Sequence, residues 1–121
     1  MLLEVRKLVF SDDLLQQALL NHFKIENIAV PNTQIQKVRF SANTGKASSI
    51  VVEFVTADPK KPYEVRLNEQ FVLTAMIMTC KTYGVPLPRD ATKTLQLTKQ
   101  GLAMTVSMKV DTSTPVQKAA G

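Results

Sequence analysis

Two side chains of the types used in catalysis and metal binding are His22 and Cys80, the only histidine and the only cysteine of the chain. A tetrahedral zinc site of histidine and cysteine ligands needs more such residues than one chain carries. A cysteine and a histidine can act together as nucleophile and base when they lie within hydrogen-bond reach. They fall in two predicted helices that could pack together, which would allow such a pair. Cys80, however, aligns with Phe23, an apolar position of an internal duplication. We therefore predict structural roles for both residues and expect neither a metal nor a cofactor.

Acidic residues and glycines show no catalytic pattern either. Asp12, Asp13 and Glu69 lie at the starts of predicted helices, where negative charge interacts favourably with the helix dipole. None of the four glycines, at positions 45, 84, 101 and 121, belongs to a phosphate-binding loop. We therefore expect the chain not to be an enzyme. An enzyme or small-ligand binder that uses a cleft between the two copies is the weakest of the alternatives.

The elements that position these residues come from the internal duplication. Residues 10–40 align without a gap with residues 67–97, and the apolar positions, the helix start and the helix end recur together. Three aligned positions are identical, namely Ala18 and Ala75, Lys24 and Lys81, and Pro31 and Pro88. The recurrence predicts two halves of similar architecture, at residues 1–56 and 62–110.

Each half contains one predicted helix with matching end signals. Ser11 and Asn68 are suitable N-cap residues, because their side chains can accept a hydrogen bond from a free backbone N–H of the first turn. Asn27 and Gly84 follow the two apolar series, and both residue types readily adopt the left-handed conformation that ends a helix. We predict helices over residues 12–26 and 69–83.

Alternating apolar residues predict one strand before each helix and two strands after it. The strands before the helices cover residues 4–9 and 63–67, and both contain Glu-Val-Arg. The clearest strand is the last, in which alternate residues from Leu102 to Val110 are apolar. Short turns and one apolar face per strand predict an α+β fold: a duplicated βαββ unit, a mainly antiparallel sheet, two helices on one face and pseudo-twofold halves. We expect one domain over residues 1–110 and a disordered tail over residues 111–121.

Length and composition set the class of protein. A chain of 121 residues and 13.4 kDa falls in the usual range for one domain. No apolar run is long enough to span a bilayer, and Glu4, Arg6 and Lys7 interrupt the apolar start before a signal-peptide core can form. A single cysteine needs no oxidising compartment. We therefore expect a cytoplasmic protein that does not enter membranes.

The chain is basic, with 15 lysines and arginines against 10 acidic residues and a formal net charge of +5. The sheet face opposite the helices is expected to carry Lys37, Arg39, Arg66 and Lys109, which could contact phosphates. Because residues of a strand alternate between its two faces, the aromatic residues of the strands are expected on the opposite face. The basic face therefore has no aromatic side chains that could stack on bases. A basic nucleic-acid-binding domain is therefore the alternative function.

The two predicted helices differ in polarity, and this difference gives the leading hypothesis. Gln16 and Asn21 of the first helix align with Leu73 and Met78 of the second, which is apolar almost all round. Such a helix is usually covered on more than one side. We predict that Leu73, Ile77 and Met78 contact a partner protein; cover within the chain is the competing explanation. The expected function is a non-catalytic association module, as a homodimer or as a subunit of a larger complex. Edge strands offer a second route to pairing.

Overall fold

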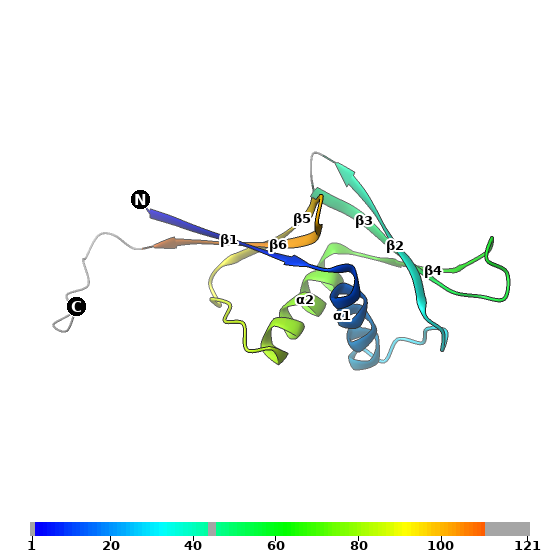
Figure 1. Ribbon diagram of the computed structural model, residues 1–121. Coiled ribbons are helices and arrows are strands. Elements are labelled where there is room, and N and C mark those ends of the chain that lie inside the picture. Colours follow the sequence, from blue (N-terminus) through cyan, green and yellow to red (C-terminus); the bar gives the residue numbers. More distant parts are fainter. Residues whose placement is uncertain (1, 44–45, 111–121) are drawn as a thin grey trace.

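A computed structural model describes residues 2–43 and 46–110 of the chain. Its elements occur in the order βαββ twice, which confirms the α+β class and the duplicated unit (Figure 1). The first unit comprises β1 (Leu2–Phe10), α1 (Asp12–Ile25), β2 (Ile35–Asn43) and β3 (Lys46–Phe54). The second comprises β4 (Tyr63–Leu67), α2 (Glu69–Thr82), β5 (Thr92–Thr98) and β6 (Gly101–Val110). The tail expected at 111–121 lies outside the described residues.

Both helices begin and end at the predicted signals. The side chains of Ser11 and Asn68 accept hydrogen bonds from the backbone N–H three residues later, at 3.2 and 2.8 Å respectively. Asn27 and Gly84 adopt left-handed conformations just after the two helices, with φ values of 59° and 70°. The N-cap and helix-end predictions are therefore confirmed in both halves.

The six strands form two antiparallel sheets of three strands each, in the orders β1-β6-β5 and β2-β3-β4. β1 belongs to the first half of the sequence but pairs with β6 of the second half, and β4 pairs with β3 in the corresponding way. Each half thus gives its first strand to the hairpin of the other half. The prediction of one sheet is wrong, because apolar alternation determines which face of a strand is buried but not which strand it pairs with.

Aligned residues at the ends of the two exchanged strands occupy similar buried positions. Phe10 lies opposite Leu102 in the first sheet, and Leu67, which aligns with Phe10, lies opposite Ile50 in the second. All four side chains are buried. This correspondence is the one expected of pseudo-twofold halves. The shared Glu-Val-Arg, by contrast, is not structurally equivalent in β1 and β4, because the central valine is exposed in β1 but packs against the core in β4.

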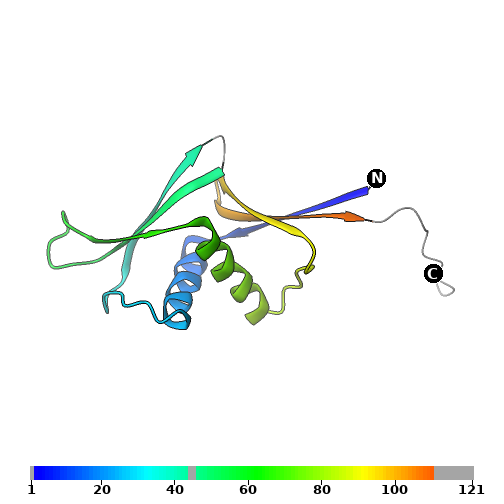
Figure 2. The same cartoon turned by 180° about the vertical axis from the view of Figure 1, so that it is seen from behind.

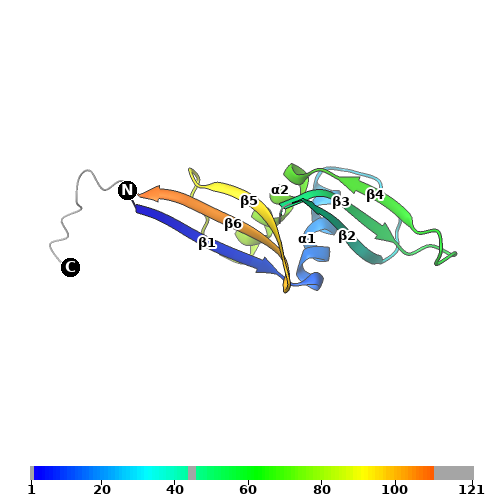
Figure 3. The same ribbon diagram turned by 90° about the horizontal axis from the view of Figure 1, so that it is seen from above.

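Both helices lie on one side of the two sheets, as predicted. The sheets slope away from each other above the helices in Figure 1, and Figure 2 shows the same arrangement from behind. Seen from above, the sheets lie end to end (Figure 3). Within the described residues, neither helix has the length and apolarity needed to cross a bilayer.

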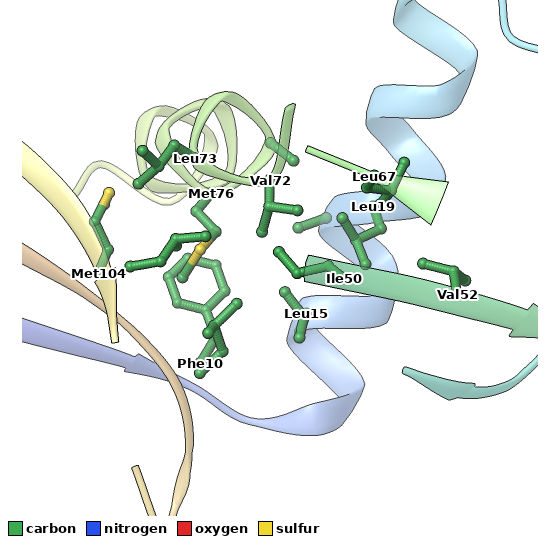
Figure 4. Close-up of a cluster of buried hydrophobic side chains, with 14 of the residues drawn as sticks. Phe10, Leu15, Leu19, Ile50, Val52, Leu67, Val72, Leu73, Met76 and Met104 are labelled. Atoms are coloured by element: carbon green, nitrogen blue, oxygen red, sulfur yellow. The ribbon is translucent and has the colours of Figure 1, made fainter. Parts of the chain in front are cut away.

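One hydrophobic core joins both helices to both sheets (Figure 4). Side chains from α1, α2 and strands of either sheet point toward one another in it, so each half depends on the other for burial. The labelled members are Phe10, Leu15, Leu19, Ile50, Val52, Leu67, Val72, Leu73, Met76 and Met104.

Candidate protein-association surface

β1 is an edge strand with one side free. It pairs with β6 along its whole length, from Leu2 opposite Val110 to Phe10 opposite Leu102. Among the described residues, no strand pairs with its other side, and Figure 3 shows this side facing away from the rest of the sheet. An edge of this kind presents a row of backbone N–H and C=O groups on which another strand can pair.

Six of the nine side chains of β1 are apolar, and Glu4, Arg6 and Lys7 are charged. Odd-numbered residues point to the outer face, away from the helices, because Phe10 and Leu8 point to the core. Leu3, Val5 and Val9 on the outer face are 53%, 55% and 41% exposed, and Leu2 at the start of the strand is 55% exposed. β1 thus holds four of the ten exposed large hydrophobic residues in the described chain. Such clustering in one strand is typical of a surface that another protein covers.

The corresponding edge strand of the other sheet, β4, is protected. It is only five residues long, directly follows Pro62, and carries Glu64 and Arg66 on its outer face. Short length, charged side chains and proline are the devices by which natural proteins prevent pairing at sheet edges. β1 is nine residues long, and its outer face carries Leu3, Val5 and Val9 beside one charged residue, Lys7. The first strands of the two copies therefore differ in length and in the share of apolar residues on the outer face.

The helix residues predicted to contact a partner occupy different environments. Leu73 is 7% exposed and belongs to the core of the chain itself, so it does not lie on the surface where a partner was expected. Ile77 is partly buried against the same core, whereas Met78 is 39% exposed. α2 contacts α1 and one strand of each sheet, β3 and β5. This cover within the chain explains why α2 lacks a polar face.

Met78 lines a groove of about 310 Å³ between the two helices, together with Ile25 of α1. His22 lines the same groove and is almost fully buried. Its ring centroid lies 4.6 Å from that of Phe71, and its Nε2 is 3.5 Å from Oε1 of Glu26. His22 is thus packed between the two helices, and its Nδ1 is buried without a hydrogen-bond partner among the described residues.

The residues of the predicted nucleic-acid face are divided between the two sheets. Lys37, Arg39 and Arg66 share the outer face of β2-β3-β4, whereas Lys109 lies opposite Leu3 on the other sheet. The Arg39 guanidinium donates hydrogen bonds to Glu53 and Glu64, and the carboxylate of Glu53 is the main cause that raises the pKa of Arg39. Arg39 is therefore already engaged by two carboxylates. This cluster of Arg39, Glu53 and Glu64 cannot be predicted from the sequence, because it depends on the register of three strands.

Cys80 lines a second cavity, of about 290 Å³, between β1 and the end of α2. Its neighbours in that cavity include Leu8, Phe10 and Val85, and the thiol is buried. Burial raises the pKa of the Cys80 thiol, an effect that the charge of Arg6 partly opposes. Within the part of the chain that the structure describes, His22 Nδ1 has no hydrogen-bond partner and Nε2 lies beside Glu26, so no hydrogen bond to Cys80 is present; the described residues contain no cluster of three or more potential metal ligands. Cys80 thus has the position of a core residue.

We expect the Cys80 thiol to react slowly with a disulfide reagent at neutral pH, about tenfold or more slower in the folded chain than in denaturant, because reaction requires local opening. Since a raised pKa favours the neutral thiol, the rate in the folded chain should rise with pH over the alkaline range. Absorbance of the released thiolate measures both rates. Equal rates for folded and unfolded chains would contradict the buried position.

Comparisons of the chain with protein-family models, with curated proteins and with solved structures find no match.

Proposed function

We propose that the chain is a non-catalytic protein-association module whose contact surface is the free edge of β1. The observation that carries this proposal is the combination, in one nine-residue strand, of four exposed large hydrophobic residues and an edge with which no strand of the described residues pairs. Addition of a strand at such an edge provides main-chain hydrogen bonds, and the alternating side chains provide specificity. Burial of Leu3, Val5 and Val9 would add a hydrophobic contribution.

Nucleic-acid binding is the alternative function, and its support is narrower. The net charge of +5 attracts polyanions in general. On the outer face of β2-β3-β4, however, Arg39 is paired with two carboxylates. Among the side chains of this face that the structure describes, Lys37 and Arg66 are the basic residues without an ion pair. Protein association through β1 is therefore favoured.

Val5→Lys should weaken association by about tenfold or more, because it replaces a central apolar contact with a charge that protects sheet edges. Sedimentation velocity over a range of protein concentrations measures the effect. Since Val5 is 55% exposed, the free energy of unfolding should change little.

Met78→Lys is the matched control, because it adds the same charge at an exposed apolar residue of the groove between the helices. We expect it to leave association unchanged. If Met78→Lys disrupts association and Val5→Lys does not, the contact surface is the groove and not β1. If the chain associates equally well with either substitution, the proposed role of both surfaces is excluded.

A further inference from the structure

We infer that the protein that covers β1 is a second copy of this chain, whose β1 pairs antiparallel with the first about a twofold axis at Val5. This inference rests on the proposed function and names its partner. The two sheets would then form one continuous sheet of six strands, in the order β5-β6-β1 followed by β1-β6-β5 of the second copy. A twofold interface of this kind must be self-complementary, because each contact occurs twice.

The sequence of β1 is self-complementary about Val5. In the antiparallel register centred on this residue, Glu4 lies opposite Arg6 of the second copy, and Arg6 lies opposite Glu4. Leu2 lies opposite Leu8 of the second copy, on the same face as these charges. On the outer face the Val5 side chains of the two copies are neighbours. Lys7 of each copy lies opposite Leu3 of the other, and its aliphatic part can cover that leucine. Opposite charges and apolar pairs directly across two strands both stabilise a sheet.

Glu4 and Arg6 face no opposite charge across the strand pair that β1 forms with β6. Across the β1-β6 pair they face Met108 and Val106, which are apolar. Among the described residues, Glu4 forms no ion pair. Arg6 donates from Nη2 to the carbonyl oxygen of Pro86 at 2.6 Å, but its Nε is buried and has no hydrogen-bond partner. A carboxylate from a strand added at the free edge would lie beside this guanidinium.

Neighbouring registers of the same symmetry are less favourable. Centring the pair on Arg6 places the two Arg6 side chains opposite each other, and centring it on Glu4 does the same for the two carboxylates. Like charges directly opposite each other destabilise a strand pair. Of these three registers, only the one centred on Val5 places Glu4 opposite Arg6 of the second copy and Arg6 opposite Glu4.

Charge reversal with complementation tests this register. Glu4→Arg alone places arginine opposite arginine at two sites, and Arg6→Glu alone places glutamate opposite glutamate. We expect each single variant to raise the dimer dissociation constant by about tenfold or more. An equimolar mixture of the two variants restores both opposite pairs in a heterodimer, and the double variant restores them in a homodimer. Both should return to within about threefold of the original chain.

Sedimentation velocity provides the readout, and circular dichroism checks that each variant is folded. Arg89→Glu and Asp90→Arg are matched controls, because they make the same changes of charge in an exposed loop. Neither should alter association. Recovery in the mixture cannot arise from a folding defect, since the same two chains are present separately in the single-variant samples.

Two results overturn the inference. One is a chain that stays monomeric at every accessible concentration, and the other is a dimer that Val5→Lys disrupts but mixing of the charge variants does not restore. If the chain is monomeric and Val5→Lys abolishes its binding to a different protein, the second copy is excluded while the proposed function stands. If Val5→Lys changes neither self-association nor binding to any other protein, both proposals fail.

Discussion

Replacement of Phe23 by alanine is expected to lower the free energy of unfolding by about 3–5 kcal/mol. Phe23 is 1% exposed and lies where three elements meet. Its ring centroid is 6.1 Å from that of Phe54 in β3 and 5.2 Å from that of Phe71 in α2. Truncation removes these contacts and leaves a cavity that the surrounding helices and sheet cannot fill without moving. Urea unfolding followed by circular dichroism measures the change.

Ile25→Ala is the matched control for Phe23→Ala. Ile25 lies in the same last turn of α1 but is 60% exposed. We expect this substitution to change the free energy of unfolding by no more than about 0.5 kcal/mol. Similar losses for the two variants would mean that α1 does not use the face on which Phe23 lies to contact the core.

Gly101→Ala should cost about 2–4 kcal/mol, because it combines backbone strain with a steric clash. Gly101 begins β6 with a φ of 138°, and a Cβ at this position would lie 2.5 Å from the backbone oxygen of Phe10. Phe10 is the last residue of β1, so the clash acts at the end of the pairing between β1 and β6. Thermal unfolding measures the loss, and amide hydrogen exchange should show faster opening of β1.

Gly84→Ala separates the cost of the left-handed backbone conformation from the cost of the steric clash. Gly84 also has a positive φ, of 70°, but a Cβ there would meet no atom within 4 Å. We therefore expect only the cost of the left-handed conformation, about 1–2 kcal/mol. If Gly101→Ala costs no more than Gly84→Ala, the close approach of β6 to the end of β1 is not tight in solution.

The exchanged strands β1 and β4 each form an edge of a sheet that is made mainly by the other half. Because β1 pairs with the hairpin of the second half, a strand added to β1 extends a sheet made mainly by that half. In the sheet of β2, β3 and β4, the edge strand that corresponds to β1 is β4, which carries Glu64 and Arg66. The first strand of the second copy is thus protected by charge, whereas the first strand of the first copy can accept another strand.

Local features of the structure could be predicted from the sequence because they depend on neighbouring residues. Ser11, Asn27, Asn68 and Gly84 define the helix ends through hydrogen bonds and backbone conformations that involve only a few adjacent positions. Apolar alternation likewise identified the strands and the faces that they bury. The α+β class and the placement of both helices on one side follow from these elements.

The candidate surface was predicted only in part. The sequence predicts edge strands as one route to pairing, but the predicted contact residues lie on α2, where Leu73 is buried in the chain. The pairing of Arg39 with Glu53 and Glu64 was missed. Both results depend on contacts between residues far apart in the sequence.

The sequence by itself therefore determined the helices, the strands and the duplication, since short-range interactions specify them. Only the tertiary structure decided that the first strands are exchanged and that two sheets form in place of one. It also decided that β1 lies at a sheet edge that no other described strand pairs with, and that Leu73 of α2 is buried. Many strand orders bury the same apolar faces equally well. The choice among them comes from packing of both helices and both hairpins in one core, which no local pattern encodes.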